Sequence, residues 1–248
     1  MKQPCPEKIT RRCFLENTAR LYLSAGLCSL FLDFGRAEAS VNAGSGFEPA
    51  YLKLHKTGEL KKRAEELWAI MEDCELCPRR CGVNRHKGKR GVCRAPGTQL
   101  VISAHHPHFG EERPLVGKGG SGTIFLTHCN LRCAFCQKWE IANLGVGSES
   151  NIDDFAGMML ELQEIGCHNI NLVTPTHYSA HIIKAIDVAA EQGLRLTILY
   201  NNSGWERLEI LRLLDGIVDI YLPDFKYWDS GMSAKYSDGA ESYPEITA

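Results

Sequence analysis

The feature that most constrains the fold is an alternation of short apolar segments with helix-like segments that begins at residue 123. Strand-sized segments separated by roughly 10 to 15 helical residues are typical of βαβ units, whose strands form a parallel sheet. The predicted strands are 123–126, 170–173, 196–200 and 217–222, and the predicted helices are 152–165, 178–192 and 205–214. We therefore expect an α/β fold in which four βα units are visible.

The chain before this alternation divides into shorter regions. Residues 1–40 contain the pair Arg11-Arg12, an apolar stretch and then Ala37-Glu38-Ala39, a pattern that resembles a twin-arginine export signal. The alternative for this segment is an amphipathic helix packed on the domain. The remaining predictions are a linker over 41–57, a Cys-rich N-terminal region over 58–118 that opens with a helix at 58–73, a strand at 98–104 and a loop at 105–122.

Composition and charge exclude several classes of function. The chain has 44% hydrophobic and 23% charged residues, as expected for a globular protein, and its net charge of -2 favours no polyanionic partner. The basic residues between 79 and 94 lack the interleaved aromatic side chains that stack on bases, so we expect no nucleic acid. The sequence contains no run of roughly 18 uncharged apolar residues, so it predicts no membrane span.

Cysteine usage points to metal chemistry. Seven of the eleven cysteines fall in two tight groups between residues 74 and 136. The second group is Cys129, Cys133 and Cys136, spaced C-x3-C-x2-C directly after the first predicted strand. Three thiolates on one loop would leave one iron of a four-iron, four-sulfur cluster without a protein ligand, open to an exogenous chelate. The alternative is a three-cysteine zinc site, with His128 as a fourth ligand.

The segment CNLRCAFC, which contains these cysteines, resembles the signature of the radical S-adenosylmethionine superfamily, including the aromatic Phe135 before the last cysteine. The resemblance implies a partial (β/α) barrel of the radical SAM type and a cluster that binds S-adenosylmethionine at its open iron. In that family, reductive cleavage of S-adenosylmethionine gives a 5′-deoxyadenosyl radical, which abstracts a hydrogen atom from the substrate.

The strand segments GTIFLTHCNLRCAFCQ, NLVTPTH, LYNNSGW and YLPDFKY look like those of homologues of pyruvate formate-lyase activating enzyme. Activases carry Gly-Gly-Glu after the second strand, where this chain has Thr174-Pro175-Thr176 and so lacks the acidic contact to the methionine amino group. The resemblance implies that the cofactor lies near Phe135, Thr174 and Thr176. It also implies that the cofactor, or a cation beside it, lies near Asn201, Ser203, Asp224 and Lys226.

The same resemblance implies partners and a compartment. We expect a low-potential electron donor of the flavodoxin or ferredoxin type, and a protein substrate such as a glycine that is converted to a glycyl radical. The chemistry of S-adenosylmethionine favours the cytoplasm, whereas the signal-like segment 1–40 favours export.

The first cysteine group is Cys74, Cys77, Cys81 and Cys93, spaced C-x2-C-x3-C-x11-C. Four close thiolates complete either a zinc tetrahedron or a second iron-sulfur cluster, and spacing alone does not separate the two. This segment resembles the N-terminal part of a subfamily of activase homologues. Free thiols are the alternative, and a disulfide pair would require export.

The end of the sequence departs from the family pattern. Only 21 residues follow Tyr227, and they show little periodicity, whereas a six-strand barrel needs two more βα units. We therefore expect a radical SAM core over 119–248 that is truncated at its C-terminus. This departure keeps open the alternative of an iron-sulfur or zinc protein without radical activity.

Overall fold

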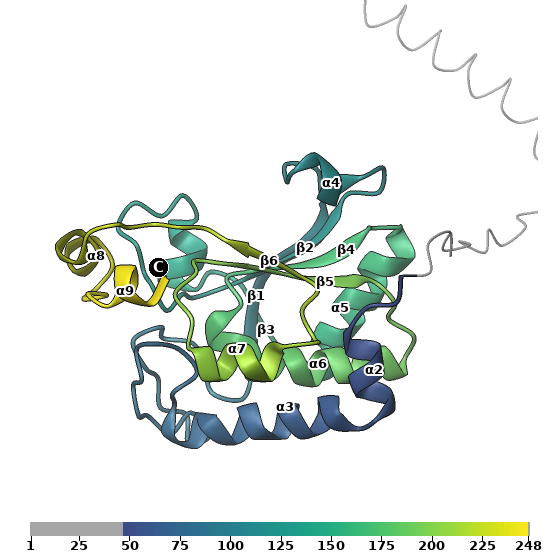
Figure 1. Ribbon diagram of the computed structural model, residues 1–248, viewed down its shortest axis with the longest axis horizontal. Helices are drawn as coiled ribbons and strands as arrows, with labels where there is room; N and C mark the ends of the chain where they lie inside the picture. The colour runs from purple at the N-terminus through teal and green to yellow at the C-terminus, as the bar shows by residue number, and fades with distance from the viewer. Residues whose placement is uncertain (1–46, 248) are drawn as a thin grey trace, which may run out of the picture. The chain divides into compact units, whose positions relative to one another are not determined.

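A mixed six-stranded sheet organises the protein in the computed structural model, which describes residues 47–247 (Figure 1). The order across the sheet is β3-β1-β2-β4-β5-β6. Its strands are β1 (Leu100–His108), β2 (Ser121–Leu126), β3 (Ser148–Ser150), β4 (Asn169–Val173), β5 (Thr197–Asn202) and β6 (Ile220–Pro223). The signal-like segment 1–40 lies outside the described residues.

Strands β2, β4, β5 and β6 are parallel, which confirms the four strands predicted from the alternation. Strand β1 runs antiparallel to both β2 and β3. It continues to His108, beyond the predicted 98–104, and the expected loop 105–122 also contains α4 (Arg113–Val116) and the start of β2. Pairing with β2 holds residues 105–108 extended, although their sequence, His-His-Pro-His, has no apolar alternation.

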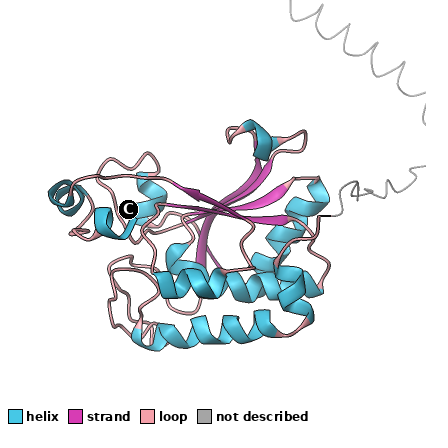
Figure 2. Cartoon of the chain, viewed as in Figure 1, coloured by secondary structure: helices cyan, strands magenta, loops and turns pink. Residues whose placement is uncertain are grey.

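Helices cover one face of this sheet (Figures 1 and 2). They are α2 (Tyr51–Lys56), α3 (Glu59–Ile70), α5 (Ile152–Ile165), α6 (Ser179–Glu191) and α7 (Leu208–Leu214). The helix α2 lies within the range 41–57 that was predicted to be a linker. Its residues Tyr51 and Leu52 are buried in the main core, and that burial outweighs the loop-like composition around them.

The two faces of the sheet differ in polarity because side chains alternate along each strand. Ile124, Leu172 and Ile198 belong to the core beneath the helices. Asn171 lies on the opposite face, where its amide donates to Glu111 at 3.0 Å. The helix-covered face therefore supplies stability, and the other face carries polar groups.

Short helices complete the described chain. The segments η1 (Met71–Asp73), η2 (Glu140–Leu144) and η3 (Thr176–Tyr178) are single short turns. The last residues form α8 (Ser230–Tyr236) and α9 (Tyr243–Thr247), although their sequence shows little periodicity. No helix within residues 47–247 is long and apolar enough to cross a membrane.

Candidate metal and cofactor site

The loop that follows β2 carries Cys129, Cys133 and Cys136. Cys133 is buried in a small apolar cluster with Leu131, Trp205, Tyr227, Ala240 and Tyr243, against which Cys129 and Cys136 also pack. Burial, with a smaller contribution from the two neighbouring cysteines, raises the pKa of the Cys129 thiol to about 11, although backbone N–H groups that donate to its sulfur oppose the rise. The three thiols therefore share one environment at the carboxyl end of β2.

Three residues near this loop have left-handed backbones although none is glycine. His128 has φ of 64°, Arg132 has 58° and Thr174, at the end of β4, has 62°. A β-branched residue such as threonine rarely adopts this conformation, and such strain concentrates at functional sites. Thr174 is held there by a hydrogen bond from its N–H to the carbonyl oxygen of Asn201, at 2.9 Å.

His128, the alternative fourth ligand of a zinc site, is buried next to Cys129. A Cβ added to Gly145 would come within 2.2 Å of its ring, so the ring lies against the turn that ends η2. Burial, together with nearby Arg90 and Arg132, lowers the pKa of His128 to about 4. The ring is therefore neutral at physiological pH, and its Nδ1 has no hydrogen-bond partner among the described residues.

The C-terminal residues fold over the cysteine loop. The N–H of Ala134 donates to the carbonyl oxygen of Tyr236 at 2.8 Å, and Arg132 pairs with Asp238 at 3.1 Å. The hydroxyl of Ser237 donates to the sulfur of Cys133 at 3.1 Å. The segment that appeared aperiodic in sequence is thus a structural partner of this loop.

Tyr243, from α9, joins the loop to the ends of β5 and β6. Its hydroxyl accepts the N–H of Lys226 at 2.7 Å and donates to the carbonyl oxygen of Ser203 at 2.6 Å. The side chains of Lys226 and Asp224 form an ion pair.

Phe135 is 54% exposed and meets Tyr227 edge-on, with ring centroids 5.7 Å apart. The residues predicted to lie near the cofactor therefore occupy neighbouring strand ends.

Glu206 is a site residue that the sequence did not single out. It is only 4% exposed, and one of its oxygens accepts the hydroxyl of Thr176 at 2.6 Å. Its other oxygen is buried without a partner among the described residues. Burial raises the pKa of Glu206 to about 8, although the side chains of Thr176 and Asn202 lower it. Its position in a predicted helix gave no signal of this role.

The first cysteine group lies in the segment between η1 and β1. Cys74, Cys77 and Cys93 are buried and Cys81 is half-buried, and all are free thiols. Burial raises the pKa of Cys77 far above its usual range, and the other three thiols add to this effect. Within residues 47–247, no three His, Cys, Asp or Glu side chains have the arrangement of a preformed metal site.

Arg79 connects the two cysteine groups. It lies between Cys77 and Cys81 and donates to the carbonyl oxygens of Asn130 at 2.9 Å, Ser237 at 2.7 Å and Asp238 at 2.5 Å. Its guanidinium also stacks over Trp205, 4.9 Å from the ring centroid. Asn130 adjoins Cys129, so a single side chain spans from one cysteine group to the other.

The chemistry of the donors fits an iron-sulfur cluster with one open iron. Three thiols come from one loop, and thiolates are the usual ligands of such clusters. One buried oxygen of Glu206 and the hydroxyl of Ser203, which have no hydrogen-bond partner within residues 47–247, lie at the same ends of the parallel strands.

The chain is similar to the uncharacterized protein MJ0674 of Methanocaldococcus jannaschii, with 30% identity over 194 residues. The alignment covers 75% of this chain and 55% of that protein, so the chain spans about half the length of the relative that it matches. No family model and no solved structure matches the chain.

Proposed function

We propose that the chain is a radical S-adenosylmethionine enzyme, similar to the activating enzymes of glycyl-radical enzymes. Cys129, Cys133 and Cys136 hold a four-iron, four-sulfur cluster, and the neighbouring strand ends hold S-adenosylmethionine. When bound, this pair supplies the reductive cleavage that starts hydrogen-atom abstraction. The electron comes from a low-potential donor of the flavodoxin or ferredoxin type.

The observation that carries this proposal is the position of the three-cysteine loop. It directly follows β2, the first of four parallel strands, and packs on the residues that follow β5 and β6. In α/β folds, ligands bind at the carboxyl ends of parallel strands. We interpret β2, β4, β5 and β6 as four strands of a barrel of the radical SAM type, with helices on its outer face.

Glu206 can replace the acidic contact that is missing from Thr174-Pro175-Thr176. The hydroxyl of Thr176 donates to the Glu206 carboxyl, whose second, buried oxygen has no hydrogen-bond partner in the described part of the chain. An ammonium group is a suitable partner for a buried carboxylate. In this proposal, Glu206 receives the amino group of the methionine moiety, and Asn201, Ser203, Asp224 and Lys226 contact the remaining polar groups.

The substrate in this proposal is a protein residue, such as a glycine in a partner enzyme. The sheet face opposite the helices carries polar groups such as Asn171, and substrate would approach the radical from that side. The chain's role there is to position the substrate and keep water from the radical.

The test is anaerobic reconstitution with iron and sulfide, followed by reduction in the presence of S-adenosylmethionine. We expect 5′-deoxyadenosine to form, and to be absent in Cys129→Ser. The matched control is Cys167→Ser, which removes a buried thiol from the main core and should keep the product. An intact cluster that yields no 5′-deoxyadenosine would refute the enzyme and favour a metal-binding protein without radical activity.

A further inference from the structure

The segment between η1 and β1 is held without regular secondary structure. From Cys74 to Gln99 the described chain forms no helix or strand, yet it buries Leu76 and Arg85 to 1% exposure. Loops longer than roughly 15 residues are uncommon in compact domains unless they have a function or a covalent or metal constraint. The origin of the order in this segment therefore has to be found in its side chains.

The backbone of the segment is arranged around its sulfurs. The N–H of Cys74 donates to Val83 at 3.0 Å, and that of Gly82 donates back to Cys74 at 3.1 Å, which closes a loop around Cys77. The N–H of Val92 donates to the sulfur of Cys81 at 3.4 Å. A Cβ on Gly91 would lie 2.7 Å from that sulfur, so a larger residue there would displace the side chain of Cys81.

Tight turns flank the other cysteines of the segment. Left-handed backbones occur at Arg80, with φ of 40°, and at Arg94, with φ of 62°, next to Cys81 and Cys93 respectively. Both positions cost strain for a residue with a side chain. Such backbone conformations persist only where other interactions, such as bonds to a metal, offset their strain.

We propose that Cys74, Cys77, Cys81 and Cys93 bind one thiolate-ligated metal centre, separate from the one at Cys129, that fixes this segment. Four thiolates suit zinc or iron, and binding releases the thiol protons. Cys74, Cys77 and Cys93 are buried and Cys81 is half-buried, and because the described side chains form no preformed metal site, the sulfurs must move on binding. The cations Arg79 and Arg85 lie close enough to offset the negative charge of these thiolates.

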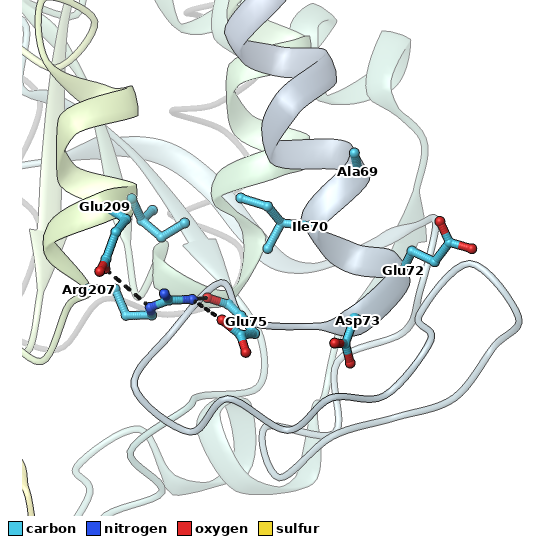
Figure 3. Close-up of a pocket in the computed structure, with 8 residues that line it drawn as sticks. Ala69, Ile70, Glu72, Asp73, Glu75, Arg207 and Glu209 are labelled. Carbon is cyan, nitrogen blue, oxygen red and sulfur yellow. Dashed lines mark hydrogen bonds and ion pairs between the residues drawn. The ribbon is translucent and has the colours of Figure 1, made fainter.

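A metal bound at these four cysteines would fix the segment in the conformation in which three arginines contact the rest of the domain. Arg79 holds the Cys129 loop, and Arg85 donates to the carbonyl oxygens of His177 at 2.7 Å and Pro96 at 2.8 Å. Arg207, at the start of α7, donates to the backbone carbonyl oxygen of Glu75 at 2.6 Å and to its carboxylate at 2.8 Å (Figure 3). The metal thereby joins the N-terminal segment to the carboxyl ends of the strands.

Metal analysis of the full chain in a Cys129→Ser, Cys133→Ser, Cys136→Ser background tests this proposal. The protein is produced anaerobically with iron and zinc supplied. We expect zinc or iron to remain in stoichiometric amount, and the measurement identifies which of the two is bound. Adding Cys77→Ser and Cys93→Ser should reduce it to background, whereas adding Cys167→Ser should not. A folded triple variant without metal would overturn the proposal.

Thiol alkylation of the unaltered chain gives a second readout that needs no substitution. In the metal-loaded protein, we expect Cys74, Cys77, Cys81 and Cys93 to resist iodoacetamide together and to become reactive together after chelation, as mapped by mass spectrometry. Equal alkylation of these four thiols before and after chelation would contradict the proposal. Neither readout depends on S-adenosylmethionine, so an inactive chain with metal bound at the first cysteine group refutes only the radical function.

Discussion

The buried carboxyl of Glu206 predicts a measurable dependence of stability on pH. Its pKa is raised from 4.5 to about 8 because the folded protein removes the carboxylate from water. The folded state therefore binds the proton more tightly than the unfolded state does. By linkage, the contribution of this group is most favourable below pH 4.5 and is lost as pH rises from 4.5 to about 8.

The size of the effect follows from the same two pKa values. At about 1.4 kcal/mol per pH unit, the rise from 4.5 to about 8 corresponds to at most about 5 kcal/mol of unfolding free energy. The substitution Glu206→Gln keeps an oxygen that accepts the hydroxyl of Thr176 and removes the titration. The variant should match the unaltered chain near pH 5 and exceed it by several kcal/mol near pH 8.

Urea unfolding between pH 5 and pH 9, on proteins with the same measured metal content, gives the required free energies. Glu66→Gln is the matched control, because Glu66 is exposed on α3. The difference in unfolding free energy between Glu206→Gln and this surface variant should grow from pH 5 to pH 8. A constant difference for Glu206→Gln, or a variant that is less stable at pH 8, would show that Glu206 is not buried as described.

Three further predictions follow from particular contacts. Gly97→Ala should lower the free energy of unfolding by about 2 to 3 kcal/mol, because the new Cβ would lie 1.8 Å from the carbonyl oxygen of Arg85. Gly157→Ala, within α5 and with open space around it, should instead raise the free energy of unfolding by about 1 kcal/mol. Thermal melts compare the two variants. Arg79→Lys should cost about 2 to 4 kcal/mol, because an ammonium cannot reach the carbonyl oxygens on both sides, and alkylation of Cys133 should become faster. If Glu206 receives the amino group, S-adenosylmethionine should bind more tightly as pH rises to about 8, and Glu206→Gln should abolish that dependence in equilibrium binding measurements.

The sequence by itself determined the elements whose patterns are local. The apolar spacing over 152–165 predicted α5 at its observed bounds, and the four apolar segments from residue 123 predicted the parallel strands. Periodicity suffices there because each such segment buries one face wherever it packs. Likewise, the spacing of Cys129, Cys133 and Cys136 placed three thiols on one loop, since that proximity is set by the chain itself.

Only the tertiary structure decided what surrounds those thiols. The packing of α8 and α9 on the cysteine loop, the reach of Arg79 between the two cysteine groups and the burial of Glu206 all join residues far apart in sequence. The cost of burying a charge or an amide depends on which distant groups exclude water from it, and no local pattern records that. Thus the sequence predicted which residues are candidates for chemistry, and the fold decided which of them share an environment.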